Sequence, residues 1–203
     1  MKYNFTKGIT IVETLVALGI FSIVFIAVST FQRDVIQYGA TASGSLTTSY
    51  DARIILRTIT RELRTSSVGN NGAYPLAQAG TSSITFFADT DSDNLKEQIR
   101  YYIASTTLKK GVIKPTGSPL TYVPGNEVVT ILTSNIRNST STPLFTYYGS
   151  NYDGTTEPYG YPIPLTSVRL VNVNLILDAD INRSPVSRSY TSQVTLRNLK
   201  DNL

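Results

Sequence analysis

A long apolar stretch near the N-terminus limits the fold of this chain more than any other feature. From Ile9 to Phe31 it reads ITIVETLVALGIFSIVFIAVSTF, with a single charged residue, Glu13, and no proline. As an α-helix the stretch is about 35 Å long, which is enough to cross a hydrocarbon core of about 30 Å. Lys2 and Lys7 precede it, and a basic flank favours a cytoplasmic N-terminus with the rest of the chain exported.

Glu13 helps to choose among three interpretations of this stretch. A signal anchor, or a secretory signal cleaved beside the small residues at 27–29, explains the length and the lysines but not the charge. A carboxylate deep in an apolar segment costs roughly 2.5–3.5 kcal/mol on insertion. Cleavage between Gly8 and Ile9 would create an amine that pairs with Glu13 in the same chain or in the next subunit. We favour this third interpretation over simple snorkelling of Glu13 toward an interface.

The residues around the cleavage point resemble a known processing motif. The run KGITIVETL, residues 7–15, is similar to the class III signal of type IV prepilins and type II secretion pseudopilins. The resemblance implies that a prepilin peptidase in the membrane cuts after Gly8 and methylates the amine of Ile9. It also implies that Glu13, the fifth residue of the mature chain, is needed for assembly. Ile9 departs from the phenylalanine that is usual at the first mature position.

The helix is expected to continue beyond the apolar stretch. The segment 32–45 contains Gly39 and Gly44, and each costs about 1 kcal/mol relative to Ala inside a helix, so a weaker or bent helix is predicted there. The run SSVGNNG at 66–72 predicts where the helix ends. Apolar residues three to four positions apart predict one buried helix face. They are Leu46, Tyr50, Ile54, Ile55, Ile59 and Leu63.

After residue 70 the pattern changes to that of β-strands, and no helix-length amphipathic pattern follows. β-branched and aromatic runs alternate with Pro- and Gly-rich stretches, and the polar run 89–97 predicts the connection of a hairpin. Strands are predicted at 83–88, 98–103, 127–132, 144–148, 167–177 and 190–199.

These elements together predict an α+β fold. One long helix, whose first half spans the membrane, carries an antiparallel β-sheet head packed on its second half. The predicted parts are a leader at 1–8, a transmembrane or filament-core helix at 9–31, its exposed continuation at 32–70 and a β-rich head at 71–203.

The order of the elements also resembles that of larger minor pilins and J-type pseudopilins. Heads of that family carry a strand, an Asp-rich turn, a Tyr-containing strand and a closing strand like VTLRNL at 194–199. The similarity implies a minor, low-copy subunit. It also implies partners: other pilin or pseudopilin subunits, a membrane assembly platform and membrane lipid.

An acidic run in the hairpin connection is the one candidate metal site. Asp89, Asp91 and Asp93 alternate along it, and their oxygens could converge on Ca²⁺, which takes about 6–8 oxygen ligands. The spacing matches the opening of an EF-hand loop, but Asn94 stands at the turn glycine and Arg100 at the bidentate glutamate. A polar turn held by Asx-type hydrogen bonds explains the same residues, so both interpretations stay open.

Composition argues against catalysis and gives little support for nucleic-acid binding. The chain has no Cys and no His, which removes disulfides, thiolates and imidazole bases or ligands. We find no phosphate loop, nucleophile elbow or acid/base pair and therefore expect no enzyme. The net charge is +4, but Lys2 and Lys7 of the leader supply two of the positive charges, so the charge is a weak indication of nucleic-acid binding.

Two further surfaces have a functional and an ordinary interpretation. Tyrosines at 147–164 could contact a glycan or a neighbouring subunit, but rings packed on the sheet are the preferred reading. Four arginines could meet DNA phosphates or acidic surfaces, but a solvated helix face with Asp51 and Glu62 nearby is preferred. They are Arg53, Arg57, Arg61 and Arg64.

The sequence thus predicts a structural, minor subunit of a type IV pilus-like or type II secretion-like filament. Its precursor would sit in the cytoplasmic membrane with the head outside the cytoplasm, and the mature form in a filament at the cell surface or in the periplasm. The alternative is a signal-anchored surface module whose β-rich head recognises a glycan or peptide. A cleaved, soluble exported protein is a third interpretation.

Overall fold

The chain forms two compact units, Met1–Ser43 and Gly44–Leu203, which are described separately. The computed structural model describes residues 8–178 and 187–199. The helix α1 (Ile11–Arg64) contributes its first part to one unit and its second part to the other. Its last residue lies just before the predicted end at 66–72.

The first unit, as far as it is described, is the N-terminal part of α1. Thr10 caps the helix, because its hydroxyl oxygen accepts a hydrogen bond from the backbone N–H of Glu13 at 3.3 Å. The segment 32–45, predicted to be weaker or bent, is helical throughout. Its two glycines therefore do not interrupt the helix.

The second unit contains two antiparallel sheets, whereas the sequence predicted one. The larger sheet has the order β1-β2-β3-β4-β5 and the smaller has the order β6-β7-β8. The strands of the larger sheet are β1 (Leu76–Ala79), β2 (Ser83–Ala88), β3 (Glu97–Ala104), β4 (Thr107–Ile113) and β5 (Val128–Thr133). Those of the smaller sheet are β6 (Phe145–Tyr148), β7 (Leu170–Leu177) and β8 (Arg188–Thr195).

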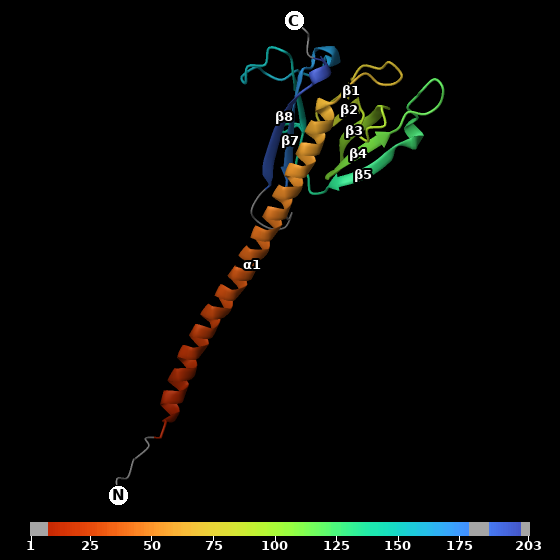
Figure 1. The fold of residues 1–203 in the computed structure, drawn as a ribbon. Helices are drawn as coiled ribbons and strands as arrows, with labels where there is room; N and C mark the ends of the chain where they lie inside the picture. The colour runs from red at the N-terminus through yellow and green to blue at the C-terminus, as the bar shows by residue number, and fades with distance from the viewer. Residues whose placement is uncertain (1–7, 179–186, 200–203) are drawn as a thin grey trace. The chain divides into compact units, whose positions relative to one another are not determined.

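The core of this unit forms where α1 meets both sheets, and the strands flank this part of the helix in Figure 1. The α+β class, with an N-terminal helix and antiparallel strands packed on it, is therefore confirmed. One continuous cluster joins residues of the helix, such as Ile59, to Phe86 of β2 and Val173 of β7. Burial of this apolar surface stabilises the fold by about 25 cal/mol per Å² removed from water.

The helix face that faces the core is only partly the predicted one. Ile55, Ile59 and Leu63 are buried as expected, but Leu46 and Tyr50 are 73% and 67% exposed. Because successive helical residues turn by about 100°, positions 46, 50 and 54 lie on roughly the opposite side from the buried residues. The buried apolar residues of α1 are Ala52, Ile55, Leu56, Ile59 and Leu63.

An ion pair crosses the larger sheet on the face turned away from the core. Arg100 on β3 donates two hydrogen bonds to Glu127, from Nε to Oε1 at 2.9 Å and from Nη2 to Oε2 at 2.7 Å. The Glu127 side chain lies over Gly111 of β4, where an added Cβ would come within 1.9 Å of its Oε1. Hydrogen bonding to Glu127 raises the pKa of Arg100 above its ordinary value.

Candidate functional site

Gly8 and Ile9 lie in an exposed, non-helical segment just before α1. No described atom lies within 4 Å of where a Cβ on Gly8 would stand, and Gly8 is not among the glycines with a positive φ. Neither packing nor backbone conformation in this chain therefore requires glycine at position 8. A requirement for glycine here would have to come from another molecule.

Glu13 lies in the first turn of α1, where its side chain is exposed. Thr10 and Glu13 have the spacing of a capping box, in which the threonine accepts from the glutamate N–H. A carboxylate at this position is also favoured by the helix dipole, by about 0.3–1 kcal/mol. The structure therefore shows the threonine half of a capping box, made through the backbone N–H of Glu13, which the T-x-x-E spacing could have predicted.

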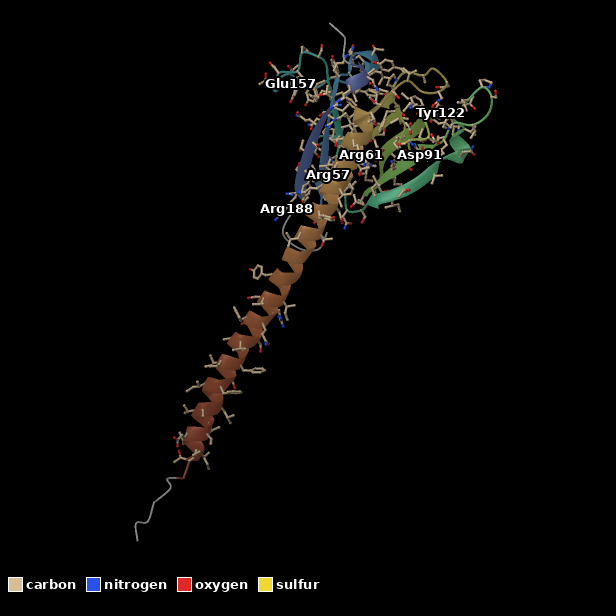
Figure 2. The ribbon with its side chains drawn as sticks, in the orientation of Figure 1. Arg57, Arg61, Asp91, Tyr122, Glu157 and Arg188 are labelled. Carbon is tan, nitrogen blue, oxygen red and sulfur yellow. The ribbon has the colours of Figure 1, made fainter. Side chains whose placement is uncertain are left out.

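The apolar residues that follow Glu13 are not covered by any described residue of the first unit. Residues 11–39 are long and apolar enough to cross a membrane, a test that an N-terminal signal sequence also passes, and this segment is entirely exposed. Side chains project from both edges of this part of the helix in Figure 2, and Phe21 and Phe31 are 67% and 68% exposed. An exposed apolar surface of this size marks a site of contact with a membrane or another protein, and a helix of this length and composition could be a membrane anchor or a signal sequence.

The acidic connection between β2 and β3 is held by its own side chains. Asp89 accepts hydrogen bonds from the backbone N–H of Ser92 at 2.7 Å and of Asn94 at 3.1 Å. Asp93 accepts one from the N–H of Leu95 at 2.8 Å. The predicted Asx-type hydrogen bonding is therefore present. Asn94 has φ 68°, the left-handed conformation that asparagine tolerates and the turn glycine of an EF-hand supplies.

Two lysines approach these carboxylates. Lys96 Nζ lies 3.5 Å from Asp89 Oδ2, and Lys114 Nζ lies 3.7 Å from Asp93 Oδ2 and contacts Asp91 Oδ2 directly. The hydrogen bond with Lys114 lowers the pKa of Asp91 below its ordinary value and raises that of Lys114. The connection thus already attracts positive charge.

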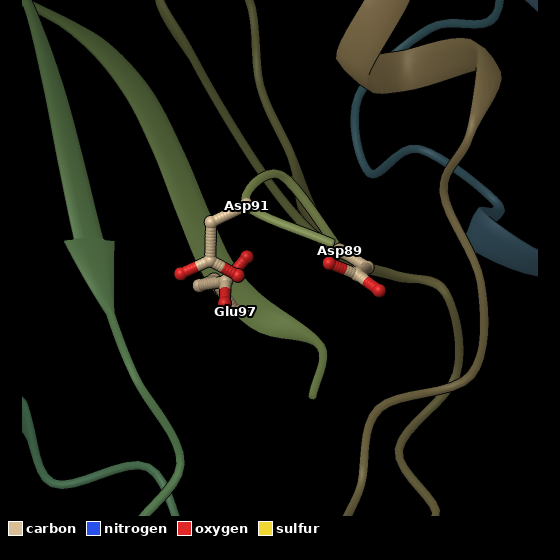
Figure 3. A group of neighbouring side chains, drawn as sticks. All are labelled: Asp89, Asp91 and Glu97. Carbon is tan, nitrogen blue, oxygen red and sulfur yellow. The ribbon is translucent and has the colours of Figure 1, made fainter. Parts of the chain in front are cut away.

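Glu97, at the start of β3, joins this group although the sequence analysis did not select it. Its side chain is buried, and its Oε2 accepts hydrogen bonds from the N–H and the hydroxyl of Thr90, both at 2.9 Å. One carboxylate oxygen each of Asp89, Asp91 and Glu97 lies within 4.8 Å of the other two. Figure 3 shows these three side chains, and Asp93 is not part of the group.

A second group of polar side chains lies in the core and was not predicted from the sequence. Glu62 was expected beside the exposed arginines of α1, but it is only 5% exposed. It accepts hydrogen bonds from the hydroxyl of Tyr101 and from Lys110 Nζ, each at 2.7 Å. Burial and the charge of Glu62 raise the pKa of Tyr101 far above its ordinary value. These hydrogen bonds join α1 to β3 and β4.

The remaining candidate surfaces lie on the outside of the second unit. The four arginines of α1 are exposed, and Figure 2 labels Arg57 and Arg61 on the helix. Of the tyrosines in 147–164, Tyr147 is buried and Tyr159 packs against the core, whereas Tyr161 is 83% exposed. Tyr147 and Tyr159 therefore anchor this segment, whereas Tyr161 is open to contact.

Comparison with known proteins does not identify a family. No protein-family model matches the chain, and no curated protein matches it significantly. The resemblance of residues 7–15 to a prepilin signal therefore stays a prediction.

Proposed function

We propose that this chain is a minor structural subunit of a type IV pilus-like or type II secretion-like filament. It is inserted in the cytoplasmic membrane as a precursor, trimmed after Gly8 by a prepilin peptidase and assembled through α1. The observation that carries the proposal is the wholly exposed apolar helix at 11–39, which follows Gly8 and has Glu13 in its first turn.

The proposal accounts for the exposed apolar surface. Lipid covers the segment in the precursor, and the same segments of neighbouring subunits cover it in the filament. Because lipid tails are as apolar as leucine, close packing and polar pairing must favour the filament over the membrane. Gly19, with no described atom within 4 Å of an added Cβ, leaves room for such close packing.

Polar pairing in the proposal comes from Glu13 and the new amine of Ile9. Both charges would lie in or near an apolar environment, where each is costly alone and less so as a pair. Glu13 forms no ion pair with any described residue, so its carboxylate is available to a neighbouring subunit. Pairing with the next subunit would set the register of assembly.

Replacing Glu13 tests this proposal, and two variants separate pairing from helix capping. Glu13→Ala removes both roles, whereas Glu13→Gln keeps a residue suited to a capping box but removes the charge. Both variants should insert in the membrane normally, and both should reduce incorporation into sheared filaments by about tenfold or more. Thr14→Ala, one residue away, is the matched control and should assemble normally.

Fractionation of cells of the native host into membrane and sheared surface material gives the readout. If Glu13→Gln is incorporated normally and Glu13→Ala is not, Glu13 acts only in capping the helix and not through its charge. Normal incorporation of both variants would remove its role in assembly altogether. If the chain without any substitution is absent from filaments, the result would favour the signal-anchored surface module.

A further inference from the structure

We propose that the connection between β2 and β3 binds one Ca²⁺ ion through the carboxylates of Asp89, Asp91 and Glu97. These residues converge although Glu97 lies on a strand and the two aspartates lie in the connection before it. The site lies wholly within the head, so the inference does not depend on filament assembly.

The unpartnered oxygen of Glu97 is the observation that points to a ligand. Glu97 is 1% exposed, and its Oε2 is used by Thr90. Its Oε1 is buried, with no hydrogen-bond partner in the described structure. A buried carboxylate oxygen without a partner is costly. A cation held between Glu97 and the two aspartates would remove this cost.

The connection is held in place before any ion binds. Asn70, in the segment after α1, accepts a hydrogen bond from the N–H of Lys96 at 2.5 Å. The hydroxyl of Tyr122 donates to the carbonyl of Lys96 at 2.6 Å and accepts from the N–H of Asn70 at 3.0 Å. Such preorganisation reduces the entropy lost when a ligand binds.

The net negative charge of the connection also favours binding of a divalent cation. Asp89, Asp91, Asp93 and Glu97 carry four negative charges, and Lys96 and Lys114 carry two positive ones. The side chain of Lys114 is 59% exposed, so it can move into solvent when an ion takes its place beside Asp91. Lys114 therefore competes with the cation.

The donor set selects the ion. All three side chains offer carboxylate oxygens, the ligands of hard cations. Mg²⁺ demands a tight octahedron, whereas Ca²⁺ accepts flexible geometry and lets water complete its coordination. With three side-chain ligands, we expect a dissociation constant of about 0.1–1 mM, as in extracellular calcium modules.

Thermal unfolding of the full chain in detergent, followed by near-UV circular dichroism of its tyrosines, tests the site. CaCl₂ should raise the midpoint by about 3–6 °C at about ten times the dissociation constant. The same concentration of MgCl₂ should raise it by less. No saturable rise with calcium would overturn the proposal.

Variants in the same connection locate the ion. Asp91→Asn and Glu97→Gln should each weaken calcium binding by about tenfold or more. Asp91 is exposed, so its variant keeps the test valid if Glu97→Gln fails to fold. Asp93→Asn, outside the group, is the matched control and should stay within about twofold. An equal loss in Asp93→Asn would contradict this choice of ligands.

Removing the competing lysine should have the opposite effect. Lys114→Gln should tighten calcium binding by up to about fivefold, since exposed ion pairs of this kind are weak. Weaker calcium binding in Lys114→Gln would contradict the inference that Lys114 occupies the place of the ion.

Discussion

The two parts of α1 place similar apolar residues in different surroundings. In the second unit, residues such as Ile59 and Leu63 are buried under two sheets, and the opposite side of the helix is exposed. In the first unit, Ile23 and Phe25 are 70% and 62% exposed, and every residue of the helix from 11 to 39 is exposed. The second part is thus stabilised by its own chain, whereas residues 11–39 are not covered by any described part of the chain.

The two glutamates of α1 follow the same division. Glu62 is buried and bonded to Lys110 and Tyr101, whereas Glu13 is exposed in the first helical turn. Glu62 acts within the head, and Glu13 is available to another molecule. Two matched pairs of substitutions test this contrast, and alkaline pH and a glycine substitution then test the stability of the head alone, from the largest expected effect to the smallest.

Removing either glutamate should affect a different property. Glu62→Ala should lower the free energy of unfolding of the head by about 3–5 kcal/mol, because it leaves Lys110 without its partner in a largely buried position. Glu13→Ala should leave that free energy unchanged. Urea unfolding of the full chain in detergent, followed by tyrosine near-UV circular dichroism, measures both. A similar loss in the two variants would contradict the division.

Matched isoleucine truncations test the apolar contrast. Ile59→Ala should destabilise the head by about 2–5 kcal/mol, because it opens a cavity at a fully buried position. Ile23→Ala removes the same atoms from an exposed position and should leave head unfolding unchanged. The same urea titration measures both variants. Equal midpoints would show that burial of Ile59 does not contribute to the stability of the head.

The head should lose stability at alkaline pH. Burial raises the pKa of Tyr101 and Tyr147 above the ordinary value of 10.0. Because the unfolded chain releases these protons first, stability is intact below pH 10 and falls above it, by about 1.4 kcal/mol per pH unit for each tyrosine. Urea midpoints at rising pH measure the fall. Tyr147→Phe should make it shallower, and an unchanged slope would exclude Tyr147 as a source.

The smallest effect is expected on the outer face of the sheet. Gly111→Ala would place a Cβ against Glu127 and displace that side chain from Arg100. The ion pair is partly exposed, so the cost should be about 1 kcal/mol or less. Glu127→Gln, which weakens the pair without adding a side-chain atom to β4, is the control. A loss in Gly111→Ala far above that of the control would mean that the backbone of β4 has to move.

The sequence predicted elements where the pattern is local. Strand β2 has the predicted bounds, and β3, β5 and β6 begin and end within one residue of the predicted ones. β4 was missed because a lysine pair and Gly111 interrupt its apolar pattern, and β1 because LAQA has little strand character. The strands predicted at 167–177 and 190–199 correspond to β7 and β8. β7 begins three residues late, at Leu170, and β8 begins at Arg188 and ends at Thr195, before a 3-10 turn.

Tertiary placement could not be predicted from the sequence. Asp89 and Asp91 stand out in sequence as an alternating acidic run, but Glu97 joins them only because β3 carries it inward. Glu62 looks like one more charge on a solvated helix, and only the packing of β3 and β4 buries it. The helix face was misjudged for Leu46 and Tyr50 because spacing alone does not tell where the sheets lie.

The N-terminal mass of the chain recovered from native membrane and surface fractions tests the central claim most directly. Prepilin processing predicts a mature chain that starts at Ile9, with or without one added methyl group. A chain that starts at Met1 in both fractions would contradict the filament proposal and favour a signal-anchored module. A start near Thr30 would contradict it too, and would mean secretion as a free protein.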